Sequence, residues 1–358
     1  MTIAELRTHR IRVPLHTPFV TAIRTVHAVE SVLVEVVGAD GFSGWGEGAA
    51  TWKVTGDSVA GIEAAAAGPL RQAVIGRSAD DLSALLRNVE RAVVGNRAAK
   101  SAVDCALHDL AARRLGIPLA RFLGSAARRV STDVTLAAGP VESMATAAAE
   151  RVAEGFDVLK VKVGDGTADD VQRLGRIRDA AGPDVRLRID ANQGWTPRAA
   201  VRAVRAMEDA GLDLELVEQP VAAGDLEGMA FVTARINTPV LADESVWSAG
   251  DLLEVVRRRA ADLVNVKLAK CGGIGPALRL LAVAQATGTG VMLGSMMETH
   301  VGVGAVASLA TVTESANVDD LDAAWWLSAS PVRGGIRYDA ATVVLPDAPG
   351  LGIDGLNP

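Results

Sequence analysis

Charged residues close successive hydrophobic runs at near-equal intervals in the second half of this 358-residue chain. Asp190 ends RLRID and Glu218 ends LELVE, while Asp243 follows VLA and Lys267 follows LVNV. Intervals of 28, 25 and 24 residues separate these four, and each is about the length of one strand and one helix. This regular spacing predicts parallel strands that alternate with helices and close into a barrel.

The charges are predicted to face the inside of that barrel. Successive side chains of a strand point to opposite faces, so LKVKV sets Lys160 and Lys162 together, away from its apolar residues. LVNVK sets Asn265 and Lys267 together in the same way. Parallel strands covered by helices are normally apolar throughout, and reactive groups of a barrel gather at its C-terminal rim. We therefore expect a reactive site at the rim.

Three carboxylates that converge on one point repel one another unless a cation lies between them. Asp190, Glu218 and Asp243 offer only oxygen donors, a set that favours Mg²⁺, with Mn²⁺ as an alternative. For any one of these residues alone, a solvated strand end is the better interpretation. The common register of the carboxylates and the lysines favours a shared metal site.

The chain divides near residue 125 into two predicted domains. Residues 1–125 are expected to form an α+β capping domain, with an antiparallel meander followed by a helix-rich part. Residues 126–358 alternate strand and helix, which predicts a modified TIM barrel, (β/α)7β, with a C-terminal tail that returns to the capping domain. The meander strands are expected at 3–15, 30–38 and 41–48. The barrel strands are expected at 130–137, 158–163, 186–190, 214–219, 239–243, 263–268, 290–295 and 317–321.

Bulk properties indicate a soluble cytoplasmic enzyme. The net charge of −7 argues against nonspecific nucleic-acid binding. The two cysteines, Cys105 and Cys271, have no CxxC spacing and are expected to be reduced thiols. The amino terminus carries charges where a secretory signal needs an apolar core. The longest apolar stretch is interrupted by Glu298 and His300, so we expect no membrane span.

Lysines on the second and sixth barrel strands would approach a bound carboxylate substrate from opposite sides. Lys162 on one face of the α-carbon and Lys267 on the other can remove a proton and return one, which inverts the stereocentre. A cation and Lys160 would stabilise the enediolate formed in between. A lysine base needs a lowered pKa near neutral pH, and burial of Lys162 beside Lys160 acts in that direction.

Several motifs are similar to those of a known family. KVKVG, DANQGW, VEQP, ADES and NVKLAKCGGIG resemble the muconate-lactonizing subgroup of the enolase superfamily, from the first barrel strand to the last. In that superfamily, lysine bases work with magnesium. The resemblance implies that Asp190, Glu218 and Asp243 are metal ligands and that Lys162 and Lys267 are the acid/base pair.

Within the subgroup, the pattern resembles the dipeptide epimerases. Asp320 and Asp322 in VDDLDAAWW look like their DxD motif, which would bind a substrate ammonium. A polar turn is the alternative interpretation of this acidic pair. A segment near 15–30 resembles their substrate-capping loop, with Arg24 placed to bind a side-chain carboxylate. The resemblance also places Thr135 with Ser295 and Met297 around the substrate.

The resemblance implies epimerisation at the C-terminal residue of a dipeptide, with L-Ala-L-Glu and L-Ala-D-Glu as the best candidates. That reaction fits murein-peptide recycling, and a homo-oligomer is expected. Trp325 and Trp326 depart from the pattern, because smaller residues are common there. Alternatives in the subgroup are o-succinylbenzoate synthase, N-acylamino-acid racemase and muconate cycloisomerase. A metal-dependent carboxylate-binding protein without catalysis is the alternative outside enzymes.

Overall fold

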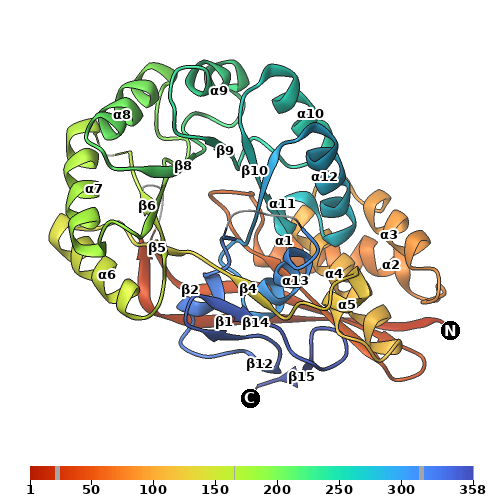
Figure 1. Cartoon of the computed structure of the whole chain (residues 1–358). Helices are drawn as coiled ribbons and strands as arrows, with labels where there is room; N and C mark the ends of the chain where they lie inside the picture. Colours follow the sequence, from red (N-terminus) through yellow and green to blue (C-terminus); the bar gives the residue numbers. More distant parts are fainter. Residues whose placement is uncertain (21–24, 165, 314–317, 358) are drawn as a thin grey trace.

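The computed structural model describes residues 1–20, 25–164, 166–313 and 318–357. An antiparallel sheet with its helices packs beside a parallel sheet that curves into a barrel (Figure 1). The predicted meander is confirmed, in the order β1-β2-β3. Its strands are β1 (Ile3–Val20), β2 (Thr25–Gly38) and β3 (Ser43–Ala49). The helices beside it are α1 (Val59–Ala65), α2 (Arg71–Val74), α3 (Leu82–Arg91), α4 (Arg97–Arg114) and α5 (Leu119–Leu123).

The first two strands form a longer hairpin than the sequence predicts. β1 continues past residue 15 to Val20, and β2 already begins at Thr25. The pairing shifts register between Pro14 and Phe19, so the hairpin continues past a proline that cannot donate to the ladder. The segment near 15–30 therefore consists largely of strand ends. Arg24 lies outside the described residues.

The predicted barrel is confirmed by a parallel sheet of order β11-β10-β9-β8-β7-β6-β5. Each strand is followed by a helix on the outer side, so that the helices surround the strands (Figure 1). The strands are β5 (Val134–Leu136), β6 (Val158–Lys162), β7 (Arg186–Asp190), β8 (Leu214–Glu218), β9 (Val240–Ala242), β10 (Leu263–Lys267) and β11 (Gly290–Gly294). The helices are α6 (Val141–Ala153), α7 (Thr167–Ala181), α8 (Pro197–Asp209), α9 (Leu226–Thr233), α10 (Ala249–Arg258), α11 (Leu268–Cys271), α12 (Ile274–Thr287) and α13 (His300–Ala310).

Two of the predicted strands differ from the structure. The stretch 130–137 is divided between β4 (Arg129–Ser131), which pairs with a strand of the C-terminal tail, and β5. Of the predicted strand 317–321, residue 317 lies outside the described residues, and Asp319 and Asp320 make only isolated bridges. These bridges reach Thr132 and Gly294, so a short segment closes the barrel between β11 and the first strand. We call residues 319–322 the seam.

A buried ion pair and apolar side chains fill the barrel below its mouth. Leu216 and Met292 belong to an apolar cluster inside the ring of strands. Arg188 on β7 is fully buried, and its guanidinium lies 2.9 Å from Asp133 Oδ2 and 2.5 Å from Glu215 Oε2. Buried charges need such partners, because an unpaired one is costly. The packed interior gives the rim residues a rigid base.

Helix termini follow the sequence signals. Thr196 accepts a hydrogen bond from the backbone of Ala199 at the start of α8, and Pro197 occupies the first turn. The side chain of Ser248 caps α10 through the amide of Asp251. The apolar stretch that contains Glu298 forms β11, a loop and α13. In the described part of the chain, no helix is long and apolar enough to cross a membrane.

The C-terminal tail contacts the helices of the first part. Its strands are β12 (Val332–Gly334), β13 (Arg337–Asp339), β14 (Thr342–Val344) and β15 (Ile353–Leu356). The amide of Leu119 donates to Gly350 O at 2.8 Å, and the amide of Leu351 donates to Asp109 Oδ1 of α4 at 2.6 Å. The tail therefore links the barrel to α4 and α5.

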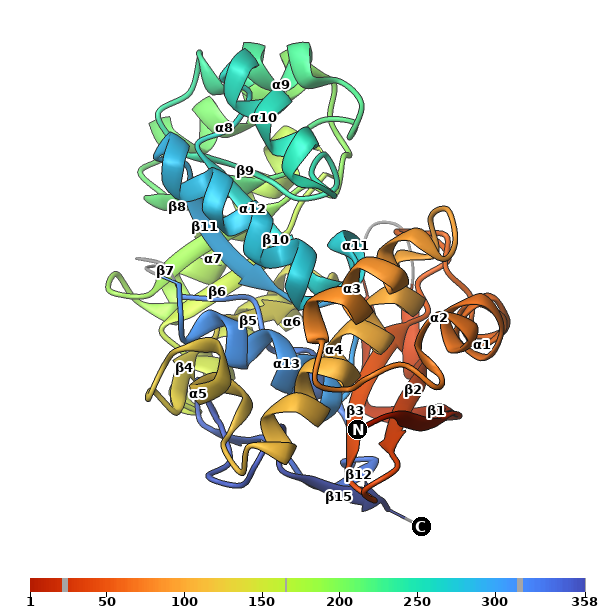
Figure 2. The same cartoon turned by 90° about the vertical axis from the view of Figure 1, so that its right-hand side faces the viewer.

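β3 packs against α4 at the distance of backbone contact (Figure 2). Its sequence SGWGEGA alternates glycine with larger residues, so Gly44, Gly46 and Gly48 share the face toward α4. A Cβ atom on Gly46 would lie 2.0 Å from Ala102 O, and one on Gly44 would lie 2.2 Å from Ala106 O. Only glycine fits on this face of β3.

We predict that Gly46→Ala lowers the free energy of unfolding by about 1–3 kcal/mol or more, because its methyl group would overlap the α4 backbone. Urea unfolding measures the change. Gly175→Ala in α7 is the matched control, because nothing beyond its chain neighbours and its own helix backbone lies within 4 Å of the added Cβ. There we expect a gain of about 0.5–1 kcal/mol from the better helix former. Equal effects at the two sites would contradict the close packing.

Candidate functional site

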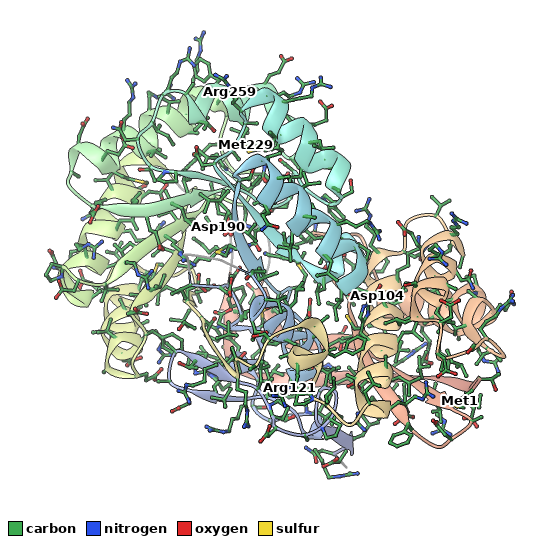
Figure 3. The ribbon with its side chains drawn as sticks, turned by 45° about the vertical axis from the view of Figure 1, so that its right-hand side comes forward. Met1, Asp104, Arg121, Asp190, Met229 and Arg259 are labelled. Atoms are coloured by element: carbon green, nitrogen blue, oxygen red, sulfur yellow. The ribbon has the colours of Figure 1, made fainter. Side chains whose placement is uncertain are left out.

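Two lysines on β6 lie among the predicted carboxylates at the barrel mouth. Lys162 Nζ donates to Asp190 Oδ2 at 2.6 Å. Lys160 Nζ lies 2.6 Å from Glu218 Oε2, 3.4 Å from Asp190 Oδ2 and 2.9 Å from Asp320 Oδ2. All are buried, and Asp190 lies within the ring of barrel strands (Figure 3). The strand order places β6, β7 and β8 side by side, which explains why these side chains meet.

A third lysine reaches the same place from β10. Lys267 Nζ donates to Asp243 Oδ2 at 3.0 Å and lies 3.8 Å from Asp320 Oδ2. Lys270, in the short helix that follows β10, hydrogen-bonds Asp243 Oδ1 and lies 3.0 Å from the carbonyl of Asn265. Its side chain is only 1% exposed, which excludes a surface position. Lys267 and Lys270 therefore hold the two oxygens of one carboxylate.

The charges of this cluster determine how tightly the lysines hold their protons. Burial favours the neutral amine, but Asp320 and Glu218 outweigh it and raise the pKa of Lys160 well above its usual range. Burial of Lys267 is outweighed in the same way by Asp243 and Asp320, which raise its pKa. In this arrangement of charges, Lys267 therefore does not have the lowered pKa that a lysine base needs near neutral pH.

The carboxylates offer a donor set that fits a hard divalent cation. Asp190, Glu218 and Asp243 are each at most 2% exposed and supply only oxygen. Beside them, Glu244 Oε2 is buried without a hydrogen-bond partner, and burial and Asp243 raise the pKa of Glu244 to about 7. Among the described residues, no three acidic, histidine or cysteine side chains are grouped closely enough to surround an ion. Lys160 Nζ lies between two of the carboxylates, 3.4 Å from Asp190 Oδ2 and 2.6 Å from Glu218 Oε2.

A pocket at the rim brings together most of the predicted residues. Those that line it are Thr135, Lys160, Lys162, Asp190, Asp243, Lys267, Ser295, Met297, Asp320 and Asp322. Glu218 lies behind them and accepts a hydrogen bond from Asn265 Nδ2 at 3.0 Å. Residues that the sequence reasoning missed also line it: Phe19, Val54, Asn192, Glu244, Met296 and Ala323. Asn192 and Glu244 lie within two residues of the predicted carboxylates Asp190 and Asp243. This closeness in the sequence is the signal that could have identified them as pocket residues.

The two carboxylates of the seam differ in their environment. Although burial opposes it, Lys160 lowers the pKa of Asp320 to about 2. Asp322 Oδ2 instead accepts from the amide of Thr135 at 2.8 Å and from Trp326 Nε1 at 3.0 Å. Burial and the neighbouring Asp320 raise the pKa of Asp322. Asp320 is therefore the more strongly ionised of the pair.

The tryptophans that depart from the sequence pattern have structural partners. Besides its bond to Asp322, Trp326 stacks on His16 of β1, with ring centroids 5.4 Å apart. Trp325 packs under Arg151, whose guanidinium carbon lies 4.8 Å from the ring centroid. The contact with His16 fastens the β1 hairpin to the segment that follows the seam, and the contact with Arg151 fastens α6 to it.

Family comparisons agree with this architecture. Residues 143–355 match the model of the enolase C-terminal domain-like family. Residues 3–124 match the mandelate racemase / muconate lactonizing enzyme N-terminal domain. The chain belongs to the enolase superfamily. The resemblance inferred from its barrel motifs is therefore confirmed.

Relatives within the superfamily are similar over the whole chain. An L-Ala-D/L-Glu epimerase of Bacillus subtilis (strain 168) is 44% identical over 99% of this chain and 97% of its own length. A substrate-liganded structure of the epimerase from Bacillus subtilis has a TM-score of 0.97 and covers 100% of both chains. A dipeptide epimerase of Enterococcus faecalis V583, complexed with Mg and L-Leu-L-Tyr, is 38% identical with a TM-score of 0.95, at 99% coverage of both chains.

The loop between β11 and α13 contains a buried acid that the sequence reasoning left without a role. Glu298 Oε1 accepts a hydrogen bond from the amide of Met296 at 3.1 Å. Burial and the neighbouring Glu47 raise the pKa of Glu298 to about 8. The folded protein therefore holds a proton here that the unfolded chain releases near the ordinary glutamate pKa of about 4.3.

We predict that Glu298→Gln makes the free energy of unfolding less dependent on pH. Between about pH 4 and pH 8 the folded wild type binds the extra proton, so its stability falls as pH rises, by up to about 1.4 kcal/mol per pH unit. Glutamine keeps an acceptor for the Met296 amide and does not titrate. Urea unfolding at about pH 5 and about pH 8 measures the difference. The exposed Glu150→Gln is the control, and parallel profiles for wild type and Glu298→Gln would refute the shift.

Proposed function

We propose that this chain is a magnesium-dependent dipeptide epimerase that inverts the α-carbon of the C-terminal residue. L-Ala-L-Glu and L-Ala-D-Glu are the proposed pair, supported by the full-length similarity to an enzyme of that name. The observation that carries the proposal is the placement of Lys162 and Lys267, on β6 and β10, around one buried pocket. A binding protein would not require two amines there.

In this proposal Asp190, Glu218 and Asp243 bind Mg²⁺, with Mn²⁺ as an alternative. They stand at the ends of the neighbouring strands β7, β8 and β9, are buried, and supply oxygen donors alone. The bound ion would compensate their charge and stabilise the negative charge that develops on the substrate carboxylate. The Mg²⁺ in the Enterococcus faecalis epimerase complex supports the choice of metal.

The two lysines divide the proton transfer between the faces of the substrate. One takes the α-proton as a base, and the other, as an ammonium, donates a proton to the opposite face of the enediolate. The reverse reaction exchanges their roles. Lys160 carries a firmly held proton among carboxylates, and this positive charge suits it to stabilise the enediolate rather than to act as a base.

Recognition of the dipeptide is assigned to the rest of the pocket. Asp320, with Asp322 beside it, would bind the substrate ammonium by charge-assisted hydrogen bonds. Further substrate contacts are proposed for Thr135, Ser295 and Met297, which line the pocket. Arg24 is proposed to bind the side-chain carboxylate of glutamate, although it lies outside the described residues.

A cytoplasmic location is part of the proposal. Cys105 and Cys271 are both buried and unpaired, and free thiols suit a reducing compartment. A homo-oligomer and a role in murein-peptide recycling stay predictions from the resemblance alone.

Removing either base should stop epimerisation. We predict that Lys162→Ala and Lys267→Ala each lower the epimerisation rate of L-Ala-L-Glu by about 10²–10⁴-fold or more, because each removes one proton carrier. Proton NMR in deuterated water follows epimerisation and α-proton exchange together. Each variant should still exchange the α-proton of one substrate, either L-Ala-L-Glu or L-Ala-D-Glu. The substrate that exchanges should differ between the two variants.

Lys100→Ala on α4 is the control variant and should retain wild-type turnover. In a separate test, wild-type enzyme from which EDTA has removed the metal should be inactive until Mg²⁺ is added back. Wild-type turnover in either base variant would refute the two-base assignment. No exchange in wild-type enzyme with any dipeptide would leave only a binding function.

Asp320→Asn should weaken substrate binding more than it slows the reaction of bound substrate. Losing a charged partner for the ammonium costs about 1.5–3 kcal/mol, which predicts a KM increase of about ten- to a hundredfold. Initial rates over a range of L-Ala-L-Glu concentrations separate KM from kcat. N-acetyl-L-Ala-L-Glu, which has no ammonium, is the matched substrate control. Equal turnover of acetylated and free dipeptide by the wild type would instead favour an N-acylamino-acid racemase.

A further inference from the structure

The face of β3 opposite its glycines is turned toward the loop 295–299, which follows β11. β3 contacts both α4 and α13. Ala49 belongs to a small apolar cluster with Met296 and Ala269. Glu47, on the same face as Ala49, is only 3% exposed although it carries a carboxylate. A strand of the capping part therefore presents a buried acid to a loop of the barrel.

The carboxylate of Glu47 accepts hydrogen bonds from three donors at the start of α13. Thr299 donates through its amide at 3.0 Å and through its hydroxyl at 2.6 Å to Glu47 Oε2. The amide of Gly302 donates to the same oxygen at 2.9 Å. Unpaired amides of a helix N-terminus favour a negative group, so these contacts stabilise both the helix and the buried acid. They join residues 252 and 255 positions apart in the sequence.

These bonds fix one end of a pocket wall. The other end is tied by the amide of Ser295, which donates to Asp320 O at 3.0 Å. Between the two anchors, Met296 and Met297 line the pocket. The position of this wall therefore depends on Glu47, which itself does not line the pocket.

We propose that Glu47 is a positioning residue for substrate binding, through which the capping part sets the position of the pocket wall 295–299. The inference rests on the proposed function, because it assigns that wall a role in holding the dipeptide. The glycine face of β3 packs directly on the backbone of α4, so α4 supports the strand that carries Glu47 from behind. Glu47 thus affects how the substrate fits the pocket by holding residues 295–299 in place, although Glu47 itself does not contact the substrate.

Glu47→Gln is the sharpest test, because it keeps the size of the side chain. Its amide nitrogen is a donor and would face the donors of Thr299 and Gly302. We expect KM for L-Ala-L-Glu to rise about tenfold, the effect of one lost charge-assisted hydrogen bond. We expect kcat to fall by less than about threefold, because the lysines lie on other strands and interactions made equally in ground and transition states affect KM alone. Mg²⁺ affinity, measured by calorimetry, should be unchanged.

A double-mutant cycle locates the effect in the contact. Thr299→Val removes the hydroxyl donor and keeps the amide, so it should raise KM less than Glu47→Gln does. The hydroxyl also accepts a hydrogen bond from the Val301 amide at 3.3 Å, so part of its effect is independent of Glu47. The double variant should therefore raise KM by less than the product of the two single effects. Glu35→Gln on β2 is the matched control in the same sheet and should leave KM unchanged. If the increase in KM of the double variant equals the product of the two single increases, the two residues act independently and the proposal is wrong.

Hydrogen exchange tests the same inference without turnover. Mass spectrometry of a peptide covering 295–302 should show faster amide exchange in Glu47→Gln than in wild type, at a temperature where both are folded. Unchanged exchange would overturn the anchoring role. Faster exchange with an unchanged KM would show a purely structural bond and would also overturn the proposal. If Glu47→Gln does not fold, Glu47→Asp and Thr299→Val provide both measurements.

If wild-type protein epimerises no dipeptide, the proposed function fails. The exchange result then still decides whether Glu47 holds the loop, so the two failures are distinguishable.

Discussion

Balance of charge in the barrel mouth is the constraint on which the rest of the site depends. Three carboxylates on adjacent strands are buried together, and each lies within hydrogen-bonding distance of a lysine ammonium. Separately, each of these charges would be too costly to bury. Together they form a network in which Lys160 and Lys267 hold their protons tightly. A cation that compensates the charge of the carboxylates would lower the pKa of Lys267, and this would link metal binding to the base proposed there.

The rigidity of this network comes from packing below and beside it. Arg188 and its carboxylate partners fill the barrel under the rim, and Lys270 fixes the second oxygen of Asp243. On the other side, β3 lies against α4 without side chains between them. The capping part is therefore a component of the site, since Phe19 and Val54 line the pocket along with the barrel residues.

Much of this could be predicted from the sequence, because strand periodicity and spacing are local signals. Strands such as 186–190 and 263–268 agree with the structure to within one residue. The seam could not be predicted as isolated bridges, since its pairing depends on strands far away in the chain. The raised pKa of Lys267 could not be predicted either, because the carboxylates that cause it, Asp243 and Asp320, come from other segments of the chain. Glu47 carries no local signal at all, because its partners lie about 250 residues downstream.

The residues of the proposed site stand on two kinds of backbone. Lysines and metal-binding candidates stand on regular strands, whereas Asp320 and Asp322 stand on a segment joined to the barrel by two bridges. Four backbone hydrogen bonds hold this segment to its two neighbours, through Asp319 on one side and Asp320 on the other. None of these four bonds involves the side chain of Asp320 or Asp322. A substitution of either side chain can therefore change the lining of the pocket while the backbone bonds that close the sheet stay in place.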